Sequence, residues 1–258
     1  MKKAFSLIEL AVVVVIVALL TGIISAGGKI KERARLQAVV KEIKDIQTAS
    51  YGFQTIYDAL PGDMSNAFEF FENSDCGHTA AAGTKTSRCN GSGNIALYGS
   101  GEGGYCREEH NFWNHMQFAK LFYTTLFDCT AYHESSKFKD LAFGVYYLGL
   151  NSNPAYDRSL NVMRIGSQIA SSLASTPYFT YNSVGKIFSP KQAWFLDNKL
   201  DDGIAYSGEL QAFNGMDQTN VQGTGCSSTT PNANNSTDYK HENYTAECYL
   251  ILPINIVK

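Results

Sequence analysis

The chain has 258 residues with a formal net charge of -3, and 17% of its residues are charged while 12% are aromatic. This length fits one domain, or one domain with an anchor. A protein that binds nucleic acid through surface charge presents a basic face, and this composition offers none, so no nucleic-acid partner is expected.

An apolar run near the amino terminus is the most informative segment. It opens at Phe5, after a basic leader of four residues, and reaches Ala26. About 20 apolar residues are enough for a helix to cross a bilayer, so we expect a transmembrane segment at about residues 5–26. Glu9 lies inside this run, and a carboxylate at the centre of a spanning helix costs about 2.5–3.5 kcal/mol. Such a residue normally has a partner and a function.

Two other interpretations of this run are a secretory signal peptide and an uncleaved signal anchor. A signal peptide has an apolar core of about 7–15 residues before a cleavage site of small residues. The tripeptide Ser25-Ala26-Gly27 offers such a site, but the run is longer than a signal-peptide core and contains Glu9.

A single long helix is expected from Phe5 to about Leu60, because no Pro interrupts this stretch. Its second half carries apolar or small residues at steps of three and four, which places them on one helical face. These residues are Leu36, Val39, Ile43, Ile46, Ser50, Phe53, Tyr57 and Leu60. A helix of some 55 residues is a rod of about 80 Å. Pro61-Gly62 ends it, since Pro cannot continue the backbone ladder.

Shorter elements between polar loops are expected in the rest of the chain. They are a surface loop at 73–106, a helix at His110–Phe127, strands at Leu141–Leu150 and Leu160–Ile169, a helix from Ser189-Pro190 to about Leu200, a strand near Gly208–Phe213, a polar loop at 214–243 and a strand at Cys248–Val257. Pro253 suggests that the last strand lies at a sheet edge or a bulge. One long helix followed by a mainly antiparallel sheet predicts an α+β fold, with the sheet packed on the carboxyl half of the helix.

Six cysteines follow the apolar run, and their even number favours disulfides if the anchor places them outside the cytoplasm. A zinc site would need closely spaced pairs such as Cys-x-x-Cys, which the sequence lacks. Six cysteines allow 15 pairings, and the residues alone leave the choice open. The cysteines are Cys76, Cys89, Cys106, Cys129, Cys226 and Cys248.

The amino-terminal pattern resembles the signal of type IV prepilins and pseudopilins, with a short basic leader, a small residue, Phe5, Glu9 and an aliphatic run. The resemblance implies that a prepilin peptidase cuts between Ala4 and Phe5 and methylates the new amino group. The residue before the cut is usually Gly in this family and is Ala4 here, which is also small. In this family the glutamate that corresponds to Glu9 meets the terminal amine of a neighbouring pilin-like subunit in a helical filament.

Three further stretches are similar to one group of prepilin-type proteins. They are Tyr57–Ala67 with Leu60-Pro61-Gly62-Asp63, Glu108–Phe122, and Asp197–Gly203 followed by Gly208. The resemblance implies a leader at 1–4, a spine helix at 5–60 and a periplasmic globular domain at 61–258. It also implies a Cys226–Cys248 disulfide around a carboxyl-terminal loop. Cys76–Cys89 and Cys106–Cys129 are then the nearest-neighbour pairs.

The expected location is a bacterial inner membrane, crossed once, with the amino terminus in the cytoplasm, or a filament at the cell surface. One observation opposes this orientation. Lys29, Lys31, Arg33 and Arg35 follow the apolar run, and the positive-inside rule counted naively would keep that flank in the cytoplasm. The cysteines and the prepilin pattern favour the amino terminus inside.

An acidic cluster, Asp197, Asp201 and Asp202, is a candidate calcium site, because calcium takes six to eight oxygen ligands from carboxylates and turn carbonyls. The alternative is a helix end at which the aspartates form a turn before Gly203. We expect no catalytic residue and no other cofactor. The sequence favours a pilin-like subunit, either a pseudopilin of type II secretion or a minor type IV pilin. The alternative is a membrane-anchored periplasmic binding protein or adhesin with no filament role.

Overall fold

The structure is a computed structural model of the whole chain. It describes residues 6–71, 89–97, 107–124, 132–148, 160–167, 185–215, 224–227 and 238–254, with the side chains of residues 22–26 excepted. Four helices and five strands lie in these ranges: α1 (Leu7–Tyr57), α2 (Ala67–Phe70), α3 (Glu108–Phe118), β1 (Tyr132–Glu134), β2 (Leu141–Leu148), β3 (Leu160–Ser167), α4 (Pro190–Leu200), β4 (Gln211–Asn214) and β5 (Cys248–Pro253). The fold is α+β, as the sequence predicts.

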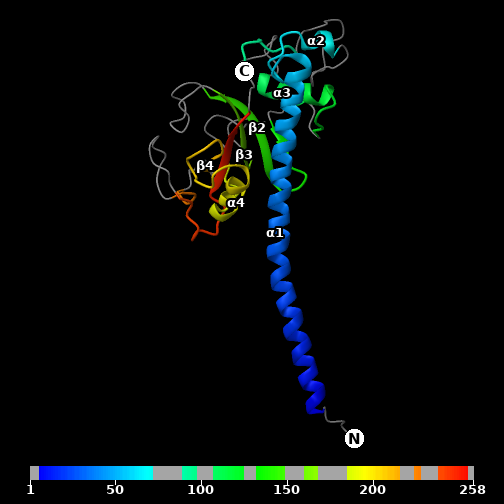
Figure 1. The fold of residues 1–258 in the computed structure, drawn as a ribbon, viewed down its shortest axis with the longest axis vertical. Coiled ribbons are helices and arrows are strands. Elements are labelled where there is room, and N and C mark those ends of the chain that lie inside the picture. The colour runs from blue at the N-terminus through cyan, green and yellow to red at the C-terminus, as the bar shows by residue number, and fades with distance from the viewer. Residues whose placement is uncertain are drawn as a thin grey trace, which may run out of the picture.

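The long helix α1 has 51 residues and is therefore about 76 Å long. It begins after Ser6, whose hydroxyl accepts a hydrogen bond from the backbone N–H of Ile8. Its last residue is Tyr57, and Asp58 caps it in a left-handed conformation with φ of 51°, so the helix stops before the Leu60 that the sequence predicts. In Figure 1 the sheet, α3 and α4 lie beside the carboxyl half of α1, and the amino-terminal half extends alone.

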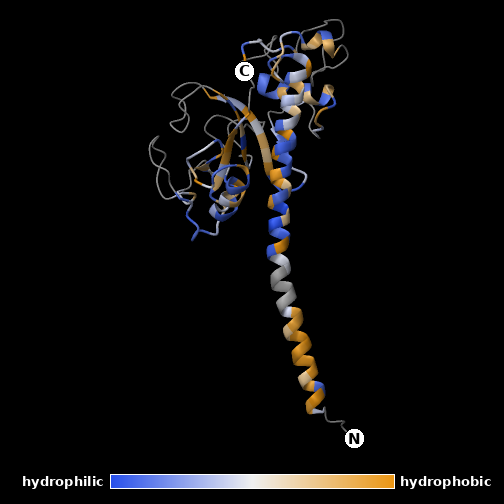
Figure 2. Cartoon of the chain, viewed as in Figure 1, coloured by the Kyte–Doolittle hydropathy of each residue, from blue (hydrophilic) through white to orange (hydrophobic). Residues whose placement is uncertain are grey.

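The free half of α1 carries an apolar surface, which Figure 2 shows along the part of the helix nearest the amino terminus. Its large aliphatic side chains are exposed, from Leu7 at 87% to Leu20 at 53%. Within the described residues, no helix combines the length and the apolar character that crossing a membrane requires. The expected span at about residues 5–26 takes in residue 5 and the side chains of 22–26, which lie outside the described residues.

The five strands form one antiparallel sheet in the order β1-β2-β3-β5-β4. Pro253 does not mark an edge strand, because β5 lies between β3 and β4. The proline is tolerated since it is the last residue of β5 and pairs only with Val162 of β3, while the β4 pairing stops at Ile251.

Alternate residues of the strands point to opposite faces of the sheet. One face carries Phe143, Met163 and Leu250 into the main core, where the buried stripe of α1 packs against it. Most of the stripe expected from the sequence is buried: Leu36, Val39, Ile43, Ile46, Ser50 and Phe53 in α1, and Leu60 beyond its end. Tyr57 is only partly buried. The other face carries a smaller cluster of Leu148, Val162, Phe213 and Ile251.

Several boundaries differ from the expected ones. The helix α3 ends at Phe118, because the chain turns at Lys120, which has a φ of 59°, so the expected extension to Phe127 is wrong at residues 119–124. The strand β4 begins at Gln211 rather than near Gly208, which has a φ of 69° in the preceding turn. Neither α2 nor β1 was expected, since both are too short to show a periodic pattern.

Candidate functional site

The candidate assembly site lies at the start of α1. Ala4 and Phe5 fall outside the described residues. Glu9 is exposed, and its Oε2 accepts a hydrogen bond of 2.9 Å from the backbone N–H of Ser6. Together with the Ser6 hydroxyl this makes a reciprocal capping box, in which two donors at the helix start are satisfied. The Ser-x-x-Glu spacing could have revealed this role from the sequence.

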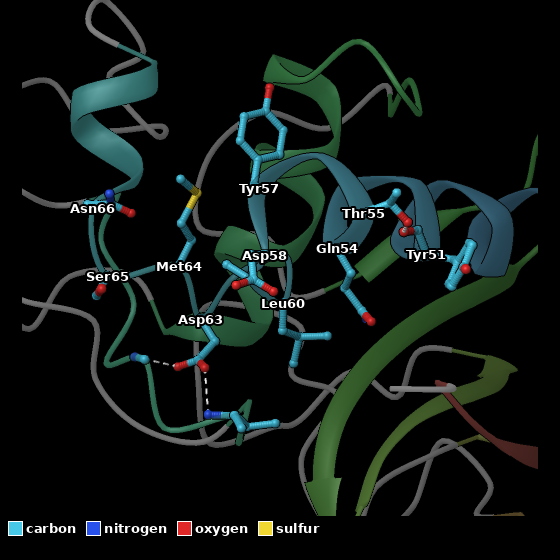
Figure 3. Close-up of a pocket in the computed structure, with 13 residues that line it drawn as sticks. Tyr51, Gln54, Thr55, Tyr57, Asp58, Leu60, Asp63, Met64, Ser65 and Asn66 are labelled. Atoms are coloured by element: carbon cyan, nitrogen blue, oxygen red, sulfur yellow. Dashed lines mark hydrogen bonds between the residues drawn. The ribbon is translucent and has the colours of Figure 1, made fainter. Parts of the chain in front are cut away.

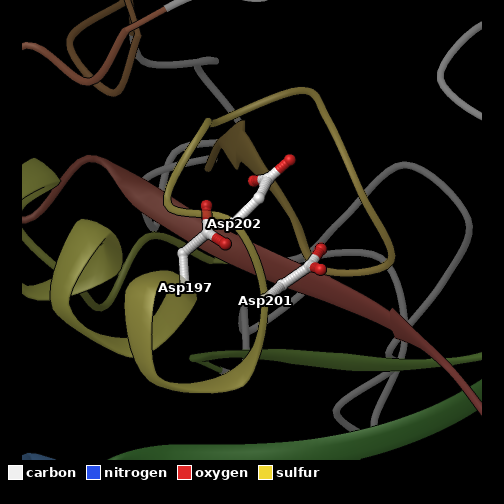
Figure 4. Close-up of side chains that lie close together, drawn as sticks. All are labelled: Asp197, Asp201 and Asp202. Carbon is white, nitrogen blue, oxygen red and sulfur yellow. The ribbon is translucent and has the colours of Figure 1, made fainter.

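The acidic cluster is brought together as the sequence predicts, and Figure 4 shows its three carboxylates at the end of α4. One oxygen from each of Asp197, Asp201 and Asp202 lies within 4.8 Å of the others. Each carboxylate also organises the turn. Asp201 accepts the backbone N–H groups of Glu209 and Leu210, and Asp202 accepts that of Ile204. These bonds account for the cluster as a helix end, and calcium binding stays a prediction.

Asp197 is the buried member of this cluster. Its Oδ1 accepts the backbone N–H of Gly203, and its Oδ2 accepts the hydroxyl of Tyr239 at 2.7 Å. Burial raises the pKa of Asp197 to about 7, with smaller contributions in the same direction from Asp202 and Asp201, while the hydrogen bonds oppose the rise. Burial, followed by the charge of Asp197, also raises the pKa of Tyr239. Asp197 therefore changes charge near neutral pH.

A disulfide joins Cys226 to Cys248 at the first residue of β5, with a Cα–Cα distance of 5.0 Å. The structure thus contains the bond that the pilin resemblance implies. Tyr239 lies in the loop that this disulfide closes, so its bond to Asp197 holds the loop against α4. Cys89 is also disulfide-bonded, whereas Cys76, Cys106 and Cys129 lie outside the described residues. The expected pairs that involve these three stay predictions.

The stretch after α1, Leu60-Pro61-Gly62-Asp63, is a structural clasp. The backbone N–H of Gly62 donates to Nδ1 of His115 at 2.8 Å, so the neutral ring carries its proton on Nε2, which donates to the carbonyl of Cys89 at 2.7 Å. Asp63 is buried, and its carboxylate accepts the backbone N–H groups of Gly93, Asn94 and Ile95. The clasp fastens the end of α1 to α3 and to the loop at 89–97.

A groove of about 590 Å³ lies beside this clasp, as shown in Figure 3. Its lining includes Tyr51, Met64 and Ile95, together with the carboxylates Asp58 and Asp63. The Asp63 oxygens are turned to the loop amides that they bind, as the dashed lines in Figure 3 mark.

A buried polar network links α1 to β1 and was not foreseen. Oε1 of Glu42 lies 3.3 Å from Nε2 of His133, and Oε2 accepts the hydroxyl of Ser135 at 2.6 Å. Glu42 and His133 are 91 residues apart, so no local spacing could have joined them. His115 is also fully buried, and its two partners, Gly62 and Cys89, lie 53 and 26 residues away in the sequence.

Comparisons of the chain with protein-family models, with curated proteins and with solved structures find no match.

Proposed function

We propose that this chain is a pilin-like subunit, either a pseudopilin of type II secretion or a minor type IV pilin. A prepilin peptidase processes it, and it joins other pilin-like subunits in a filament based on a bacterial inner membrane. The observation that carries the proposal is the division of α1. One unbroken helix has a free apolar half, with Glu9 as its one acidic residue, and a second half that packs on an antiparallel sheet.

The free half of α1 has two uses in this proposal. As a single chain it is the membrane segment, where apolar side chains face lipid. In the filament the same side chains pack against neighbouring copies of the helix. An isolated charge in such a bundle carries a large desolvation penalty, and pairing Glu9 with the terminal amine of the next chain would relieve two penalties at once. That pairing would set the register between subunits.

Mass spectrometry of the mature amino terminus tests the proposal. We expect a chain that begins at Phe5 with one added methyl group, and a faster cut in the Ala4→Gly variant. An amino terminus at Met1, or one near Gly27, would contradict processing by a prepilin peptidase. An uncut, membrane-anchored chain would favour the alternative, a periplasmic binding protein or adhesin with no filament role.

A further inference from the structure

Four positively charged side chains lie close together on α1 where the free apolar half ends. They are Lys29, Lys31, Arg33 and Arg35, here called the basic collar, and all four are exposed. At 100° per residue, Lys29 and Arg33 lie on one side of the helix and Lys31 and Arg35 on the opposite side. The collar therefore has two cations on each of two opposite sides of the helix, and these sides flank the one on which Glu32 contacts α4.

The collar has no anionic partner of its own within the described residues. Glu32, the only acid among residues 29–35, instead accepts a hydrogen bond of 2.8 Å from Nε2 of Gln192, at the start of α4. Like charges four residues apart destabilise a helix, and the collar holds two such pairs. An external anion would remove this repulsion. The exposed Lys191, beside Gln192, adds a fifth positive charge at the same level.

The distance of the collar from the start of α1 indicates which anion it would meet. Lys29 is 23 residues beyond Ser6 and Arg35 is 29 residues beyond it, which is about 34 Å and 43 Å along a helix. The hydrocarbon core of a bilayer is about 30 Å thick, and the headgroup layers bring the total to about 40–45 Å. If the apolar half starts at one face of the hydrocarbon, the opposite headgroup layer extends from about 30 Å to about 37 Å along the helix. Lys29 then lies in this layer, and Arg35 lies about 6 Å beyond it, within one Debye length of the headgroup charges.

We propose that the basic collar, with Lys191, binds the phosphate headgroups of anionic lipids at the membrane surface beneath the globular domain. The inference rests on the proposed membrane location of α1. It also explains the positive flank that conflicts with the positive-inside rule, since these cations have a lipid function in addition to any effect on orientation. Each cation near an anionic surface strengthens binding by about fivefold.

Native mass spectrometry of the full-length chain in detergent, with equal amounts of phosphatidylglycerol and phosphatidylcholine, tests the collar. We expect the wild type to retain the anionic lipid at least tenfold more often. The variant with Lys29→Gln, Lys31→Gln, Arg33→Gln and Arg35→Gln should lose this preference to within twofold of unity. The matched control is Lys41→Gln with Lys44→Gln, which removes two exposed cations further along α1 and should keep the wild-type ratio.

Three results would overturn the inference. They are a wild-type ratio near unity, equal loss in the control variant, and complete displacement of the lipid by free inorganic phosphate at the same concentration. Binding of a short DNA duplex that requires the collar, with no lipid preference, would assign the collar to DNA instead. The proposed membrane location is tested separately in liposomes, because a chain released by an alkaline carbonate wash is not embedded, whatever its lipid ratio.

Discussion

At the scale of single residues, two buried groups have pKa values shifted in opposite directions. Burial lowers the pKa of His115 to about 4, although its bond to the Cys89 carbonyl opposes the shift. Burial raises the pKa of Asp197 to about 7. The neutral form of each side chain is the one the fold stabilises, so the stability of the domain depends on pH through both.

The signs of the two contributions differ. The stability from neutral His115 is complete above its ordinary pKa of 6.5 and is lost as the pH falls toward 4. The stability from protonated Asp197 is complete below its ordinary pKa of 3.8 and is lost as the pH rises through 7. We expect the stability of His115→Asn relative to wild type to increase as the pH falls from 6.5 to 4. The stability of Asp197→Asn relative to wild type should increase as the pH rises from 4 to 8.

Chemical denaturation across this pH range measures both effects, and each variant serves as the control for the other. The measured quantity is how the difference in unfolding free energy between variant and wild type changes with pH. A loss of packing energy that is the same at every pH therefore does not affect it. Identical pH profiles for wild type and both variants would show that neither group is the titrating one.

At the scale of elements, the clasp after α1 requires glycine at position 62. Gly62 has a φ of 90°, and a Cβ there would collide with the backbone carbonyl of Glu108 in α3. Gly52 lies in the last two turns of α1, and a Cβ there would meet only methyl groups of Leu121, the nearest at 3.8 Å. The two glycines form a matched pair for testing the clasp.

We expect Gly62→Ala to destabilise the domain by about 2–4 kcal/mol, because it adds both backbone strain and overlap with α3. Gly52→Ala should instead stabilise it by about 0.5–1 kcal/mol, since alanine has the better helix propensity. Thermal unfolding followed by circular dichroism compares them. A Gly62→Ala variant as stable as wild type would mean that the close approach to α3 is not needed.

The Cys226–Cys248 bond closes a loop of 22 residues in sequence separation. In the chain-entropy model a loop of this size contributes about 3 kcal/mol, so Cys248→Ser should lower the thermal midpoint by roughly 6–12 °C. A thiol titration of the unfolded variant should find the Cys226 thiol. The double variant with Cys226→Ser should be destabilised to the same extent, and an unchanged midpoint in either would contradict a stabilising role.

The helices and strands show which features of the fold can be predicted from a single sequence. The stripe of α1 and the start of α4 were predictable, because helical spacing and the Ser189-Pro190 cap are local patterns. The position of β5 inside the sheet was not, since strand order depends on contacts between β3, β4 and β5. At the site, the grouping of Asp197 with Asp201 followed from helical proximity, whereas its bond to Tyr239 spans 42 residues.

At the scale of the whole molecule, the proposed function gives Glu9 an effect on assembly rather than on folding. Glu9 lies on the free half of α1, far along the helix from the buried stripe that begins at Leu36. We expect Glu9→Val to leave the unfolding of the globular domain unchanged and to ease membrane insertion, since the intramembrane charge is gone. It should nevertheless reduce incorporation into filaments.

Cross-linking of filaments in cells measures this incorporation, and thermal unfolding of the same variant is the internal control. Ser6→Ala is a useful companion, because it removes the hydroxyl half of the capping box and keeps the carboxylate. Glu9→Val filaments that form as readily as wild-type ones would remove Glu9 from the assembly step.

The place of β5 in the sheet has a consequence for when the domain can fold. β4 pairs only with β5 among the described strands, and β5 completes the far side of β3. The ribosome makes residues 248–253 after every other strand, so the sheet cannot close while the earlier part of the chain emerges. Until then, the described elements that can form are the helices and the β1-β2-β3 meander. If the domain is exported as the proposed function requires, this delayed closure would keep the chain unfolded enough to pass through a membrane until its last strand has followed the others.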